Sequence, residues 1–190
     1  MWTEFENAML VALERWHASA VGASEDDWVE RYKACRQVIA KTPNIDDATR
    51  SNAYAMMYGY INRYPREDFH WVEGSRVVSI GEDHDGVRVD GIVRQGDDLY
   101  IIQHVFSSIS IPASLIGDPD AYSTLKTESA ISAMNANGTQ VIGCIYNIIE
   151  ICPLRRDEYI EEDSFFEAVD DWYSDASRYT RRVINVGERD

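Results

Sequence analysis

The sequence predicts an α/β fold with a mixed central β-sheet flanked by helices, and three observations support this expectation. Helix-type patterns occupy the first third of the 190-residue chain, strand-type patterns fill the middle, and the two types alternate toward the end. Hydrophobic residues make up 45% of the chain, which is enough for a substantial core. The length suits one domain, in which residues 1–44 form an N-terminal helical part and residues 45–190 the core.

The first third of the chain predicts three amphipathic helices. Apolar residues recur at three- and four-residue spacing over residues 4–21 and 25–41. A third helix begins near Asp46 or Asp47 and ends before Pro65, because proline cannot continue a helix. The residues expected on its apolar face are Ala53, Met57, Tyr60, Ile61 and Tyr64. The aromatic residues of the first two helices are expected in the core: Phe5, Trp16, Trp28 and Tyr32.

The rest of the chain predicts strands interrupted by helices. Residues 71–80, 87–93 and 99–106 are rich in β-branched and aromatic residues and are separated by turn sequences. A helix near 120–136 leads to the almost continuously apolar run at 140–151, which is typical of a central strand covered on both faces. The last two elements expected are a long helix at 163–179 and a short strand at 182–186.

Charge and cysteine content narrow the class of protein. The chain has 33 acidic and 18 basic residues and a net charge of −15, which argues against coating nucleic acid or anionic membrane through bulk positive charge. Cys35, Cys144 and Cys152 form no CxxC motif and are too few for an iron–sulfur cluster, so they predict reduced core thiols. No apolar run reaches the ~18 residues that a transmembrane helix needs, and the acidic start lacks the basic residues of a secretory signal. We therefore expect a cytoplasmic protein without a membrane partner.

Several short motifs follow one another between Ala53 and Arg155. A helix ending in YGYINRY precedes the strand-like WVE with Glu73, then VRVDGIV with Asp90, then LYIIQHVFSS. In this order they resemble the RecB-like, phage-type branch of the PD-(D/E)XK nuclease superfamily. The resemblance implies a restriction-endonuclease-like core in which two carboxylates on neighbouring strands hold a divalent metal beside the scissile phosphate. It also implies a lysine two residues after the second carboxylate, on the same face of the strand.

The sequence departs from this family pattern at the catalytic positions. Asp90 matches the first carboxylate, but the second carboxylate is replaced by Gln103 and the lysine by Val105. Glutamine keeps the shape of glutamate without its charge, and hard divalent cations prefer carboxylates. Ala130 and Met134 stand where the family often carries glutamine and tyrosine. The resemblance thus implies a protein with a nuclease fold and a degenerate catalytic site. Such a protein would be encoded by a phage, hold no cofactor and lie in the host cytoplasm.

A rebuilt metal site is the alternative. In this superfamily the lysine can migrate to a neighbouring helix, where Lys126 is the candidate. Glu73 and Glu128 would then join Asp90 to hold Mg²⁺ or Mn²⁺, and the chain would be an active deoxyribonuclease. The simpler interpretation of Lys126 and Glu128 is that both are solvated helix residues. His104, whose neighbours are Gln103 and Val105, should point to the opposite face of the strand and pack there.

The C-terminal segment is unusually acidic. Nine carboxylates and no lysine or arginine lie between residues 157 and 177. They are Asp157, Glu158, Glu161, Glu162, Asp163, Glu167, Asp170, Asp171 and Asp175. One interpretation is an amphipathic helix that packs aromatic residues and leaves its acidic face in solvent. The other is a surface that imitates the phosphates of DNA and binds a basic or DNA-binding protein of DNA metabolism or defence. Nucleic-acid binding through the old cleft is disfavoured by charge.

Overall fold

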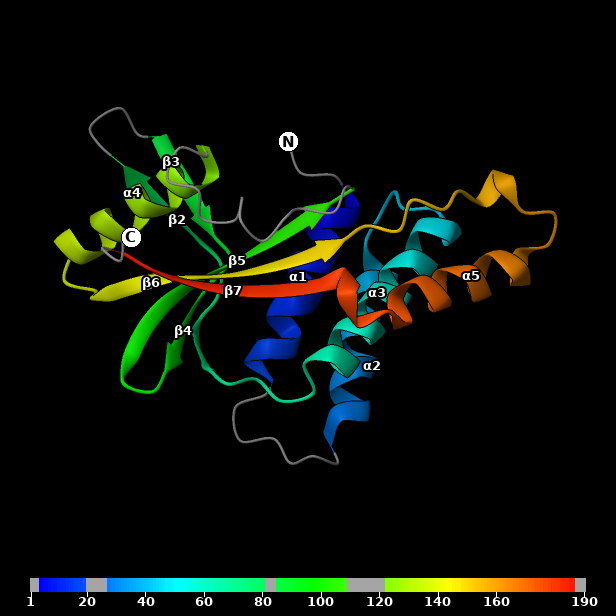
Figure 1. Ribbon diagram of the computed structural model, residues 1–190, viewed down its shortest axis with the longest axis horizontal. Coiled ribbons are helices and arrows are strands. Elements are labelled where there is room, and N and C mark those ends of the chain that lie inside the picture. Colours follow the sequence, from blue (N-terminus) through cyan, green and yellow to red (C-terminus); the bar gives the residue numbers. More distant parts are fainter. Residues whose placement is uncertain (1–3, 20–26, 81–84, 109–121, 187–190) are drawn as a thin grey trace. The chain divides into compact units, whose positions relative to one another are not determined.

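The computed structural model describes residues 4–19, 27–80, 85–108 and 122–186, and these form an α/β fold (Figure 1). The helices in this part are α1 (Glu4–Ala18), α2 (Trp28–Lys41), α3 (Asp47–Arg63), α4 (Tyr122–Ala136) and α5 (Glu162–Ser174), with short 3₁₀ helices η3 (Arg156–Glu158) and η4 (Ala176–Arg178). The strands are β1 (His70–Glu73), β2 (Arg76–Ile80), β3 (Asp85–Val89), β4 (Gly91–Gln95), β5 (Asp98–Ser107), β6 (Val141–Glu150) and β7 (Tyr179–Asn185). None of the described helices combines the length and apolar character needed to cross a membrane.

The chain divides into two compact units. The first, which we call the helical unit, comprises residues 1–67, 106–109 and 149–179. The second, which we call the sheet unit, comprises residues 68–105, 110–148 and 180–190.

The core of the helical unit is formed by α1, α2, α3 and α5. Its most deeply buried side chains include Trp16, Tyr60, Phe165 and Tyr173. The apolar face predicted for α3 is confirmed, and the Asp46 carboxylate caps that helix by accepting a hydrogen bond from the Thr49 amide at 2.6 Å. The prediction that Trp28 lies in the core is wrong. Its side chain is 40% exposed at the start of α2.

One glycine determines how closely α3 packs in the helical unit. Gly59 faces Tyr173 and Tyr179, and a Cβ atom added at this position would overlap the Tyr179 hydroxyl and the Tyr173 carbonyl oxygen. The Tyr179 hydroxyl reaches across to donate a hydrogen bond to the Met56 carbonyl at 3.1 Å. The absence of a side chain at position 59 therefore allows α3 to approach the end of α5.

The sheet unit contains a mixed five-stranded sheet in the order β1-β4-β5-β6-β7. Strand β4 runs antiparallel to both β1 and β5, and Gly96 takes the positive φ that the tight β4–β5 turn requires. The Ile151 amide donates to the Ser107 carbonyl, so the C-terminal ends of β5 and β6 lie together, as in a parallel pair. Helix α4 packs on one face of this sheet through Ala130, Ile131 and Met134.

Two of the predicted strands are each divided in two. Residues 71–80 form β1 and β2, and residues 87–93 belong to β3 and β4. Strand β1 pairs with β4, whereas β2 pairs with β3. The chain therefore leaves the five-stranded sheet after Glu73, forms a separate two-stranded hairpin from β2 and β3, and rejoins the five-stranded sheet at Gly91. Asp90 consequently lies in a bend, not within a strand.

The C-terminal helix is shorter than predicted. Helix α5 ends at Ser174, since the Asp175 carboxylate accepts a hydrogen bond from the Ser177 amide and begins the short helix η4. Strand β7 starts at Tyr179, three residues earlier than expected. The first two residues of the helix predicted near 120–136 lie outside the described residues.

The three cysteines are buried and free, which confirms the prediction of core thiols. Burial raises the pKa of Cys35 to about 12 and also raises the pKa values of Cys144 and Cys152, so little nucleophilic thiolate exists near neutral pH. We expect the folded protein to react slowly with Ellman's reagent at pH 7.5 and to titrate three thiols after denaturation in guanidinium. Rapid labelling of any one cysteine in the native protein would contradict this prediction.

Candidate functional site

Asp90, the first residue of the family-like motif, anchors a bend in the sheet unit. Its carboxylate is only 4% exposed and accepts a hydrogen bond from the His104 amide at 2.8 Å. Its own amide donates to the Ile102 carbonyl, and the Arg88 guanidinium lies 3.6 Å from the second carboxylate oxygen. These contacts fasten the β3–β4 bend to β5.

Gln103 and Val105 occupy the same face of β5, as the period of a strand requires. The Gln103 side-chain amide donates to the Arg88 carbonyl at 3.0 Å, which directs its NH₂ group at the backbone of β3 in the two-stranded hairpin. Val105 packs against the apolar cluster beneath α4 that includes Ala130 and Met134. Both positions therefore take part in local structure.

The residues of the rebuilt-site alternative lie on two elements. Glu73 is at the end of β1, where its half-exposed carboxylate pairs with the Arg76 guanidinium at 3.1 Å. Lys126 is exposed on α4, and Glu128 is partly exposed on the same helix. Across the residues that the structure describes, no three histidine, cysteine, aspartate or glutamate side chains gather closely enough to share a metal ion.

His104 lies on the other face of β5 and is buried, as predicted. Its Nδ1 atom lies 3.4 Å from the side-chain nitrogen of Asn147, and the oxygen of that amide accepts a hydrogen bond from the Arg181 guanidinium at 2.6 Å. Burial, with a smaller effect from Arg181, lowers the pKa of His104 to about 3. The imidazole is therefore neutral at physiological pH.

The acidic C-terminal segment forms part of the helical unit. Phe165, Val169 and Tyr173 of α5 are buried, so the predicted packing of its aromatic face is confirmed. Its nine carboxylate residues are all exposed. Arg155 pairs with Asp157 at 3.2 Å and Arg178 with Asp175 at 3.5 Å. Within the described part of the chain the other seven carboxylates make no ion pair: Glu158, Glu161, Glu162, Asp163, Glu167, Asp170 and Asp171.

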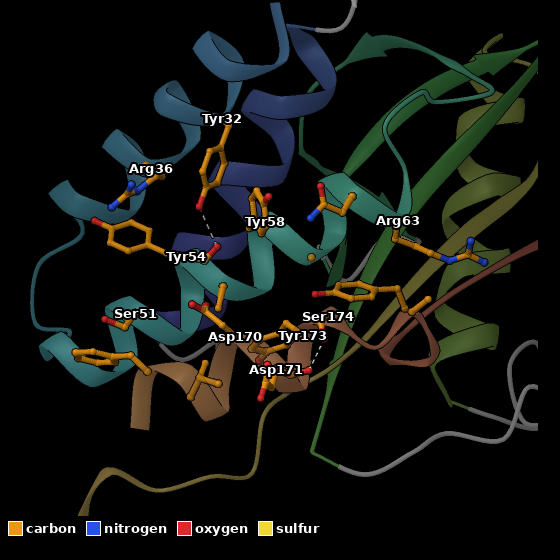
Figure 2. A pocket seen from close by; sticks show the side chains of 17 residues that line it. Tyr32, Arg36, Ser51, Tyr54, Tyr58, Arg63, Asp170, Asp171, Tyr173 and Ser174 are labelled. Atoms are coloured by element: carbon orange, nitrogen blue, oxygen red, sulfur yellow. Dashed lines mark hydrogen bonds between the residues drawn. The ribbon is translucent and has the colours of Figure 1, made fainter. Parts of the chain in front are cut away.

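A cavity of about 740 Å³ opens between α2, α3 and α5 of the helical unit (Figure 2). Its walls carry five tyrosines, two arginines and two aspartates, listed here with their elements: Tyr32 and Arg36 of α2; Tyr54, Tyr58 and Arg63 of α3; Asp170, Asp171 and Tyr173 of α5; and Tyr179 of β7. A space of this size with a few convergent polar groups is typical of a ligand site.

The sequence does not predict this cavity. Tyr32 is expected in the core, whereas the structure places its half-buried ring in the cavity wall, with its ring centre 5.6 Å from that of Tyr58. The only local signal is spacing: Tyr32 and Arg36 lie four residues apart on one helix, as do Tyr54 and Tyr58 on the next. This spacing places each pair on one side of its helix without indicating that the two sides face a common space.

Comparisons with known proteins do not identify a relative. A scan against protein-family models finds no match for the chain, and searches of curated proteins and of solved structures find none either. The structure itself shows an α/β protein with a mixed five-stranded sheet.

Proposed function

We propose that this chain is a RecB-like, restriction-endonuclease-like protein that does not cut DNA and acts by binding a basic protein of DNA metabolism or defence. The proposal rests on the contacts that the side chains of Gln103 and Val105 make. The first donates its side-chain amide to a backbone carbonyl, and the second is partly buried and packs against the apolar cluster beneath α4.

Cleavage of a phosphodiester by this class of site needs charges that these positions do not supply. Two carboxylates hold the metal, which lowers the pKa of bound water and stabilises the negative charge of the transition state. Of the two motif positions, only Asp90 carries a carboxylate, and it already accepts a hydrogen bond from the His104 amide. An amide and an isopropyl group in place of the other charged residues favour a structural role for this part of the sheet.

The acidic segment supports a protein partner. Seven exposed carboxylates make no ion pair among the described residues, and on a chain with a net charge of −15 they repel DNA and attract a cationic surface. Complementary charge of this kind increases the association rate and makes it dependent on salt. A basic or DNA-binding protein is the class of partner that this surface fits, and an inhibitor that imitates DNA would work in this way.

Cleavage assays test the catalytic half of the proposal. We expect no hydrolysis of single- or double-stranded DNA in Mn²⁺ or Mg²⁺ above the level of Asp90→Ala, because a second metal-holding carboxylate is missing from the motif. Asp98→Ala, at the start of β5, controls for loss of a carboxylate elsewhere in the sheet. Cleavage that depends on Asp90 and Lys126 would overturn the proposal and establish the rebuilt nuclease site.

A further inference from the structure

We infer that the cavity between α2, α3 and α5 receives an arginine side chain of the basic partner. This inference rests on the proposed function, which it makes specific by naming the group that is recognised and the place where it binds. Three features of the cavity support it: a carboxylate pair, a set of tyrosine rings, and the way in which the cavity's own arginines are placed.

The carboxylate pair is formed by Asp170 and Asp171 near the end of α5 (Figure 2). Neither side chain has an ion pair in the part of the chain that the structure describes. Partial burial and the neighbouring charge of Asp171 raise the pKa of Asp170, the direction expected of a carboxylate that has no counter-charge. A bound cation would stabilise the charged form of this carboxylate and so oppose both effects.

The tyrosine rings already accept a guanidinium group. The guanidinium carbon of Arg36 lies 4.5 Å from the centre of the Tyr54 ring and 5.9 Å from that of Tyr32. The Tyr58 ring beside Tyr32 is 46% exposed and faces no such group among the described cation–ring contacts. Stacking of an arginine on a tyrosine face is favourable, and more so when the contact is desolvated. The contact between Arg36 and Tyr54 is thus of the same kind as the one that we assign to the partner's arginine and Tyr58.

Each of the cavity's own arginines already contacts an aromatic ring. Arg36 lies over Tyr54, and Arg63 lies over the ring of Tyr64 at 5.4 Å, so each guanidinium is placed against an aromatic face. Asp170 and Asp171 make no ion pair with any residue that the structure describes, and their charge would repel a phosphate. Beyond the cavity, the exposed carboxylates of Asp163 and Glu167 continue the negative surface along the same helix.

Arginine fits these features better than lysine. One face of its planar guanidinium stacks on an aromatic ring, while its N–H groups, which point outward in the guanidinium plane, donate to a carboxylate. A lysine ammonium lacks this planar geometry. A cavity of about 740 Å³ has room for the whole side chain and adjoining backbone of the partner.

Binding of a defined peptide tests the inference. The probe is a short fluorescein-labelled Gly/Ser peptide with three arginines, measured by fluorescence anisotropy at low salt, and its citrulline counterpart serves as the neutral isostere. We expect Asp170→Asn/Asp171→Asn to weaken arginine-peptide binding at least about tenfold, because charge-assisted bonds are lost. The matched control, Asp163→Asn/Glu167→Gln, removes the same charge from α5 outside the cavity and should weaken binding less than about threefold. Circular dichroism of each variant verifies folding.

A second pair of variants isolates the ring contact. Tyr58→Phe keeps the aromatic face and should bind the peptide as the wild type does, whereas Tyr58→Leu should weaken it about threefold or more. Equal losses in the two charge variants would overturn the cavity site while leaving the acidic surface, and with it the proposed function, intact. Failure of the wild type to bind the peptide, or competition by inorganic pyrophosphate, would also overturn the site. Asp90-dependent DNA cleavage would instead overturn the proposed function, so the two failures are distinguishable.

Discussion

Gly59→Ala is expected to destabilise the protein by about 2–3 kcal/mol, although alanine ordinarily stabilises a helix interior relative to glycine by about 1 kcal/mol. The new Cβ would overlap the Tyr179 hydroxyl and the Tyr173 carbonyl oxygen. The Tyr179 ring is buried and has little room to shift, and the carbonyl belongs to the backbone of α5, so α3 and α5 would have to separate. Urea unfolding followed by far-ultraviolet circular dichroism measures the change in the free energy of unfolding.

Two further variants separate the clash from a general effect of substitution. Gln37→Ala, at an exposed position of α2, should change the free energy of unfolding by less than about 0.5 kcal/mol. In a double-mutant cycle, Tyr179→Phe removes the hydroxyl oxygen, which is the atom nearest to the new Cβ, and should reduce the penalty of Gly59→Ala, which gives a measurable coupling energy. A Gly59→Ala protein that is as stable as the wild type would show that α3 and α5 do not pack in this way.

His104 is expected to make the protein less stable as the pH falls from about 6.5 toward 3. Its pKa is about 3 in the folded protein and 6.5 for an ordinary histidine, so between these values the unfolded chain binds the extra proton. The stabilisation is therefore complete above pH 6.5 and is lost progressively on acidification, by up to about 1.4 kcal/mol per pH unit. Between pH 6.5 and 5, where most carboxylates are still ionised, His104→Gln should show a clearly smaller dependence of stability on pH.

The slope of stability against pH, and not the stability itself, is the informative quantity here. His104→Gln is expected to change the absolute free energy of unfolding as well, since the side chain is buried beside Asn147. His70→Gln, at an exposed position of β1, controls for the loss of an imidazole and should keep the wild-type slope. Equal slopes for the wild type and His104→Gln would show that the His104 imidazole is accessible to protons in the folded state.

Much of the secondary structure follows from local patterns in the sequence. Apolar spacing predicted α1 and α3, and Asp46 marked the start of α3 through a hydrogen bond three residues away. The long apolar run predicted β6, and strand alternation placed His104 opposite Gln103. These features depend on residues within a few positions of one another, which is why a single sequence contains them.

The two candidate sites could be predicted from the sequence to different degrees. The motif positions Asp90, Gln103 and Val105 were identified from sequence, but their present contacts were not. That Val105 packs beneath α4 is decided by a helix more than fifteen residues further along the chain. The cavity was not predictable, because Tyr32 of α2, Tyr58 of α3 and Asp170 of α5 meet only when three helices pack together.

The sequence alone determined the fold class, the helices with clear apolar faces, the buried cysteines and the acidic character of α5. Tertiary structure alone decided that residues 71–80 and 87–93 divide between two sheets, that Asp90 lies in a bend, and that an aromatic and charged cavity opens between helices. The physical reason is that helical periodicity and capping are local, whereas the partner of a strand and the neighbour of a helix face are chosen by the free energy of packing the whole chain.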